Sequence, residues 1–204
     1  MFGFDAVVQR TPVEAWGSKT ACEGWVASDV VNHLAAMCSM LTAMSQGVPA
    51  VVLGSEGLAA PGMPDHVFHG EWGEMLQEPT ITSGVDVAAA WTGFRDGLLE
   101  TLDNPAALGH EVLSPWGPTT TDGFALSAAC DAAVHTWDLA TAVGLEPVVD
   151  EELAAAALAR FQASESAGAP LRQSVVMSDE VTVRDGGALT RLIGFTGRDP
   201  AFGR

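Results

Sequence analysis

The stretch that decides the fold lies at residues 128–140 and has the sequence AACDAAVHTWDLA. Its small apolar residues are typical of a buried helix. Asp131 and His135 are four residues apart, so on a helix both side chains lie on the same side, roughly 6 Å apart at their bases. A carboxylate and an imidazole in apolar surroundings are costly unless each has a partner. The stretch therefore predicts a long helix over 122–143 with a polar pair on a buried face.

Apolar residues recur at intervals of three and four in other segments as well. Over residues 28–46 this spacing predicts a second long helix, in which Ser28 and Asp29 are suited to cap the first turn. Two further long helices are expected at 85–102 and 150–167. Residues 4–10 are expected to be the end of a short helix, and another short helix is expected at 187–196.

The remaining segments lack a helical period. Residues 110–120 predict a short extended segment, and weak alternation over 174–184 predicts a strand or an extended arm. Gly and Pro are frequent in 48–84, which is expected to be an irregular insertion. We expect one mainly helical domain over 1–204, a bundle of four long helices with a C-terminal extension at 170–204.

The composition excludes several classes of protein. The chain has 204 residues, of which 48% are apolar, and 26 acidic against 9 basic residues give it a net charge of -17. Nucleic-acid binding and anionic membranes both favour a basic surface, so neither partner is expected. No apolar run is long enough for a membrane span. Three cysteines without a CxxC spacing argue against a disulfide framework, and we expect a cytoplasmic protein.

A second histidine lies in a similar apolar run. His33 is flanked by valines, leucine and alanines in the sequence VVNHLAA over 30–36. It is either a core histidine bonded to a carbonyl group or a metal ligand. Two histidines and one carboxylate form a common set of three ligands that leaves positions open for water or substrate. The plainer alternative is that Asp131 and His135 pair only with each other.

Three motifs resemble those of a known superfamily. They are CEGWVASDVVNHL at 22–34, DAAVHTWDLATAVG at 131–144 and RLIGFTGRDP at 191–200. Their order and spacing resemble the DinB-like, mycothiol-dependent maleylpyruvate isomerase superfamily, and the last motif is similar to that of an actinobacterial subfamily of metal-binding proteins.

The resemblance implies a four-helix bundle around one divalent metal, zinc or nickel, with His33, Asp131 and His135 as ligands. The isomerase carries Glu at the position of Asp131, and the shorter Asp would shift the metal toward its own helix. The family's first helix starts a dozen or more residues earlier, so either this chain has a stub there or its start is misassigned.

The resemblance also implies a function. We expect a metal-dependent isomerase or thiol transferase in which the metal activates mycothiol or a similar low-molecular-weight thiol, or polarises a small-molecule substrate. Two alternatives stay open: an enzyme of specialised metabolism that uses the metal for a thiol-independent rearrangement or cyclisation, and a non-catalytic metal-binding or stress protein. Either a monomer or a homodimer is consistent with the sequence.

Five further residues are candidates for the site, each with a plainer alternative. Asp138 either accepts a hydrogen bond from a metal-bound imidazole or is a solvated acid paired with an arginine. Arg191 and Arg198 either bind a substrate carboxylate or form surface salt bridges. His66 and His69, in the irregular insertion, are either additional ligands for metal or substrate or exposed loop histidines.

Overall fold

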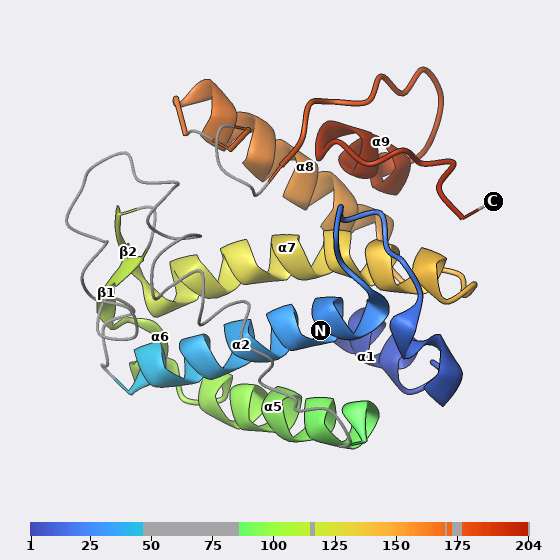
Figure 1. The fold of residues 1–204 in the computed structure, drawn as a ribbon. Coiled ribbons are helices and arrows are strands. Elements are labelled where there is room, and N and C mark those ends of the chain that lie inside the picture. The colour runs from blue at the N-terminus through green and yellow to red at the C-terminus, as the bar shows by residue number, and fades with distance from the viewer. Residues whose placement is uncertain (47–85, 115–116, 170, 173–176, 204) are drawn as a thin grey trace. The chain divides into compact units, whose positions relative to one another are not determined.

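The computed structural model describes residues 1–46, 86–114, 117–169, 171–172 and 177–203, and these are mainly helical (Figure 1). The four predicted long helices are confirmed to within two residues at each end. The helices are α1 (Phe2–Val8), the 3-10 helix η1 (Val13–Gly17), α2 (Ala27–Ser45), α5 (Val87–Leu102), α6 (Pro105–Leu108), α7 (Thr121–Ala142), α8 (Glu151–Ser166) and α9 (Ala188–Phe195).

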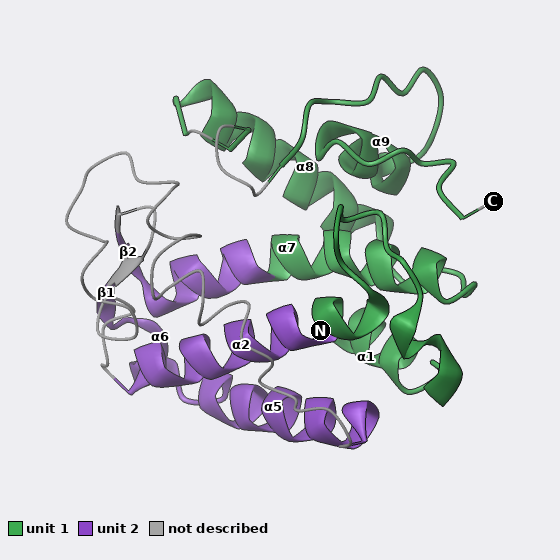
Figure 2. Cartoon of the chain, in the orientation of Figure 1, with its two compact units in different colours: residues 1–30, 129–204 green, residues 31–128 purple. Residues whose placement is uncertain are grey.

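The chain forms two compact units, which Figure 2 shows in different colours. Unit 1 comprises Met1–Val30 and Ala129–Arg204, and unit 2 comprises Val31–Ala128. Helices α2 and α7 each contribute residues to both units. The single-domain organisation stays a prediction.

In unit 1, the C-terminal part of α7 packs with α8 and α9. Helix α8 begins at Asp150, whose carboxylate accepts hydrogen bonds from two backbone N–H groups of the first turn. Its fully buried residues are alanines, Ala154 and Ala157, and such small side chains let neighbouring helices approach closely. Large residues of α9 complete this core, and full burial of each stabilises the fold by about 1.5–3 kcal/mol. The core comprises Cys130, Ala133, Val134, Trp137, Ala154, Ala157, Ala188, Leu192 and Ile193.

The segment before α9 is an extended arm rather than a strand. Residues 177–184 contain no strand, although the backbone N–H of Val181 donates to the carbonyl of Gly194. Helix α9 starts where the Glu151 carboxylate accepts a hydrogen bond from the Ala188 N–H at 2.6 Å. The arm therefore lies along α9 without forming a sheet.

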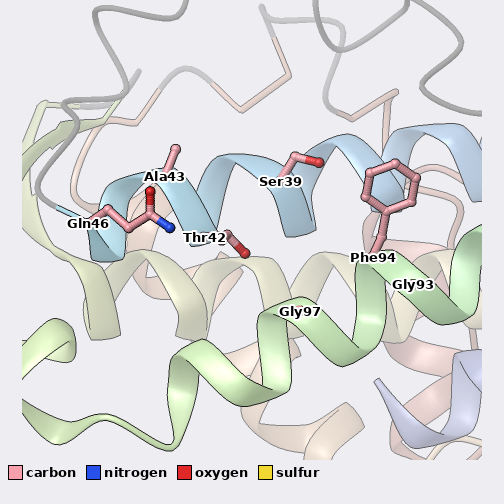
Figure 3. Close-up of a pocket in the computed structure, with 7 residues that line it drawn as sticks. All are labelled: Ser39, Thr42, Ala43, Gln46, Gly93, Phe94 and Gly97. Atoms are coloured by element: carbon pink, nitrogen blue, oxygen red, sulfur yellow. The ribbon is translucent and has the colours of Figure 1, made fainter.

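Unit 2 contains α5, α6, most of α2 and the start of α7. The expected extended segment at 110–120 is an antiparallel pair of strands, β1 (Glu111–Ser114) and β2 (Gly117–Thr120), with Glu111 opposite Thr120. A pocket of about 350 Å³ lies between α2 and α5 (Figure 3), where Gly93 and Gly97 offer no side chains to fill it. Among the described helices of the chain, none is long and apolar enough to cross a membrane.

Candidate metal centre

Helix α7 presents three polar side chains in successive turns. Asp131, His135 and Asp138 are spaced by four and three residues, which places them along one side of the helix. The His135 side chain is only 7% exposed and Asp138 is fully buried, whereas the Asp131 side chain is 29% exposed. The polar pair predicted on a buried helix face is therefore part of a longer row.

The two ring nitrogens of His135 face different carboxylates. Nδ1 lies 2.9 Å from Oδ2 of Asp138, and Nε2 lies 3.4 Å from Oδ1 of Asp131. The indole of Trp25 stacks on the imidazole, with ring centroids 5.8 Å apart and planes inclined by 11°. The imidazole is thus fixed at both edges and on one face.

Arg198 binds the buried carboxylate of Asp138. Its Nε donates to Oδ1 at 2.9 Å and its NH2 donates to Oδ2 at 2.9 Å, which is a bidentate pair. The same NH2 donates to the thiol sulfur of Cys22 at 3.1 Å, and NH1 donates to the carbonyl of Thr196 at 3.2 Å. The Cys22 thiol in turn donates to Asp138 at 3.2 Å. Every nitrogen of this guanidinium is therefore engaged within the protein.

The end of α9 aims Arg198 at this carboxylate. The Gly197 N–H donates to the carbonyl of Gly194, and the Arg198 N–H donates to the carbonyl of Ile193, which is the hydrogen-bond pattern of a Schellman motif. That motif needs a left-handed residue, and Gly197 supplies it with φ of +86°. A Cβ there would lie 2.6 Å from the Cβ of Ser178, so the position requires glycine.

The charges of the cluster shift two pKa values in opposite directions. Burial opposes ionisation of Asp138, but the Arg198 charge and the hydrogen bond from His135 outweigh it and lower the pKa of Asp138 to about 2. Burial also opposes protonation of His135, but the Asp131 carboxylate and hydrogen bonds to its neighbours raise the pKa of the imidazole well above its ordinary value. Because ionised Asp138 can only accept, Nδ1 of His135 carries a proton.

Cys22, His135 and Asp138 bring ligand-type atoms within 4.8 Å of one another, but a cation already lies there. The Arg198 guanidinium donates to both Cys22 and Asp138. A metal ion at that position would have to displace this group or lie beside its positive charge. The Nε2 edge of His135 faces the Asp131 carboxylate, and an imidazole nitrogen beside a carboxylate oxygen fits a divalent metal.

The other predicted candidates lie in several places. His33 is half-buried on α2, within unit 2, and its place in the ligand set stays a prediction. Arg191 is exposed, and its NH1 donates to the carbonyl of Gly186 at 2.7 Å. His66 and His69 lie outside the described residues.

Sequence reasoning assigned no chemical role to Cys22. The lack of a CxxC spacing argued only against a disulfide framework, and Cys38 and Cys130 are buried free thiols. Cys22 lies in the charged cluster instead. The signal available was its position three residues before Trp25, within a motif that the resemblance had already marked.

Comparison with known proteins gives one match. The family model described as the mycothiol maleylpyruvate isomerase N-terminal domain matches residues 3–140. That range includes Cys22, Asp131, His135 and Asp138, whereas Arg198 lies beyond it. Neither the curated proteins nor the solved structures gave a match. Because the matched range covers more than half of the chain, this protein belongs to the mycothiol maleylpyruvate isomerase N-terminal domain family.

Proposed function

We propose that this chain is a metal-dependent enzyme of the maleylpyruvate isomerase type, which binds one divalent metal with His33, Asp131 and His135. The observation that carries the proposal is the arrangement of the His135 ring. Its Nε2 lies 3.4 Å from the Asp131 carboxylate, while Nδ1 donates to Asp138. A histidine that binds a metal usually donates its other ring N–H to a carboxylate or carbonyl group, so this ring is prepared to bind through Nε2.

The third ligand is proposed from the resemblance in sequence. His33 follows the CEGW motif and lies on α2, and its match to the family's helix motif supports its inclusion. Two imidazoles and one carboxylate suit zinc, with nickel as the second choice. Three ligands leave a coordination position open, which catalysis requires and a purely structural metal does not.

A divalent metal held there would supply Lewis acidity, which would lower the pKa of a bound thiol or polarise a substrate oxygen. The chain's own residues prepare the site for it. Asp131 and His135 would hold it through side chains one helical turn apart, and Asp138 accepts a hydrogen bond from the Nδ1–H of the ring. The indole of Trp25 stacks on one face of the imidazole.

The reaction that we propose is the isomerisation of a small unsaturated substrate, or the transfer of a thiol to an electrophile. In the first case mycothiol or a similar thiol adds to a double bond, rotation follows, and elimination returns the thiol. Low-molecular-weight thiols of this kind are kept reduced in the cytoplasm, which is where we place the protein.

The test measures metal content and thiol chemistry separately. Metal analysis of the purified wild type is compared with that of His33→Ala and His135→Ala, with His110→Ala, an exposed histidine, as the matched control. We expect about one divalent ion per wild-type and control chain, and a loss of most of it in the other two. Metal retained at the wild-type level in His135→Ala would contradict the proposed ligand set.

A thiol-conjugation assay then tests the reaction. Conjugation of mycothiol to monobromobimane should be faster with the loaded protein than without it, and it should fall with the metal content of the variants. A protein that binds metal but never accelerates a thiol reaction would favour a metal-binding protein without catalysis. Full turnover of a substrate without any thiol would favour a thiol-independent rearrangement.

A further inference from the structure

The C-terminal segment brings one charged side chain to the candidate metal centre. Arg198 follows α9 and lies beyond the range that matches the family, residues 3–140. The Arg198 side chain is 10% exposed, and the side chain of its bidentate partner Asp138 is fully buried. The partners are 60 residues apart in sequence.

A buried ion pair of this kind is poor evidence for stability alone. Removing two charges from water costs several kcal/mol per ion, and well-packed apolar residues often replace such pairs without loss. The pair here has a connection that apolar residues would lack, because it is linked to the His135 ring. The oxygen of Asp138 that accepts from Arg198 NH2, Oδ2, also accepts from Nδ1 of His135.

The geometry also determines which way the Asp138 carboxylate faces. Two parallel N–H groups of Arg198 fix the plane of the carboxylate, because a bidentate pair allows little rotation. The Cys22 thiol approaches the same Oδ2 from another element. With its plane fixed, Oδ2 remains 2.9 Å from Nδ1.

We propose that Arg198 is a positioning residue, which acts through Asp138 to hold the His135 ring with its proton on Nδ1 and its Nε2 directed toward Asp131. The expected effect on metal affinity rests on the proposed function, whereas the position of the ring does not depend on it. Arg198 is not a ligand, because a guanidinium is cationic and has donors only. The C-terminal segment thereby prepares a ligand that belongs to the family-matched part of the chain.

The test observes the Nδ1 proton directly. In metal-free, ¹⁵N-labelled protein, the wild type should show a ring N–H signal of His135 that is downfield and slow to exchange with water. Nδ1 carries this proton whether the ring is neutral or protonated, so the signal does not depend on metal. In Arg198→Lys, which keeps the charge but not the fork, we expect the signal to broaden or disappear, and zinc affinity to fall about ten- to a hundredfold.

Arg172→Lys is the matched control. Arg172 also lies in the C-terminal segment, pairs with Glu165 at 2.6 Å and donates to the Ser178 and Phe195 carbonyls, without contacting the cluster. It should lose thermal stability but keep the His135 signal and the zinc affinity. An Arg198→Lys protein that behaves in the same way as Arg172→Lys would overturn the inference.

A second variant protects the test against misfolding. Arg198→Gln keeps Asp138 and one N–H donor for its carboxylate but removes the charge and the fork, and thermal unfolding shows whether it is folded. Loss of the protected Nδ1 proton in folded Arg198→Gln supports the inference, and its persistence contradicts it. A wild type that binds no zinc would contradict the proposed function instead, while the Nδ1 signal would still decide the role of Arg198.

Discussion

The two ring nitrogens of His135 lie beside carboxylates that differ in burial and in their partners. Asp138, fully buried and paired with Arg198, has its pKa lowered to about 2 and accepts a hydrogen bond from the Nδ1–H of His135. Asp131, more exposed, lies beside Nε2. The difference between the two carboxylates is their burial and their partners, because both are aspartates on the same helix. Asp138, buried beside a cation, is a permanent hydrogen-bond acceptor for the ring. Asp131, more exposed, can exchange the imidazole for another partner such as a metal ion.

The first prediction concerns the energy of the Asp138–Arg198 pair. Asp138→Leu leaves the guanidinium buried without its carboxylate, and Arg198→Met leaves the carboxylate buried without its cation, so we expect the free energy of unfolding to fall by about 3–5 kcal/mol in each. The double variant that combines these two substitutions leaves no unpaired charge and should lose much less. Urea unfolding of Asp138→Leu, Arg198→Met and the double variant measures this as a double-mutant cycle. Additive losses would mean that the two side chains do not act as a pair.

At the scale of elements, the turn after α9 links local sequence to the site. Gly197 has φ of +86°, and its two neighbouring hydrogen bonds close the helix and turn Arg198 back. Gly197→Ala adds a Cβ at a left-handed position and close to Ser178. We expect a loss of about 1–3 kcal/mol, together with weaker zinc binding, because Arg198 is displaced.

A glycine with the opposite expectation provides the control for this change. Gly93 lies inside α5, and a Cβ there would meet no atom within 4 Å. Gly93→Ala should raise stability by about 0.5–1 kcal/mol, because alanine loses less backbone entropy in a helix. Thermal unfolding compares the two variants. Equal changes in thermal stability for both substitutions would show that the turn does not require glycine at position 197.

Helix α2 carries a prediction about pH. Cys38 is fully buried, and burial raises the pKa of its thiol from 9.0 to about 12. The stability that follows from this shift is present in full below pH 9, and it is lost as pH rises toward 12 because the unfolded chain releases the proton first. The expected slope from this thiol approaches about 1.4 kcal/mol per pH unit above pH 9. The chain has no tyrosine, so no phenol titrates in this range.

Urea unfolding at several pH values between 8 and 11 measures that slope. Cys38→Ala should reduce it, and the remaining slope includes the buried thiol of Cys130, whose pKa is raised by burial. The substitution itself lowers stability at every pH. Ser39→Ala, on the exposed side of the same turn, should leave the slope as in the wild type. A slope that Cys38→Ala does not change would show that this thiol does not control alkaline stability.

How far sequence predicts structure depends on the distance between partners. Apolar periodicity predicted the long helices because each period is contained within one segment. The spacing of Asp131 and His135 likewise predicted their shared side of α7. The sequence did not predict that Asp138 pairs with Arg198, because this contact depends on the end of α9 and on its packing with α8. Gly197, before Arg198, was a local signal for a turn. A turn alone does not identify the group that the following side chain contacts.

At the scale of the whole molecule, net charge is the dominant feature. The chain carries 26 acidic and 9 basic residues. Like charges destabilise a folded chain by self-repulsion, and salt screens that repulsion over a Debye length of about 8 Å at physiological ionic strength. We therefore expect the melting temperature of metal-free protein to rise when sodium chloride increases from low to physiological concentration.

Buried and exposed charges should respond differently to that salt. The Asp138–Arg198 pair is removed from solvent, so salt weakens it little, whereas exposed pairs such as Arg95–Asp96 lose most of their small contribution. Repulsion among the excess acidic groups remains the larger effect, and its screening stabilises the fold. Potassium chloride at the same ionic strength is the control, because screening does not depend on which monovalent cation is present. A melting temperature that falls with both salts would mean that attractive surface pairs outweigh the repulsion.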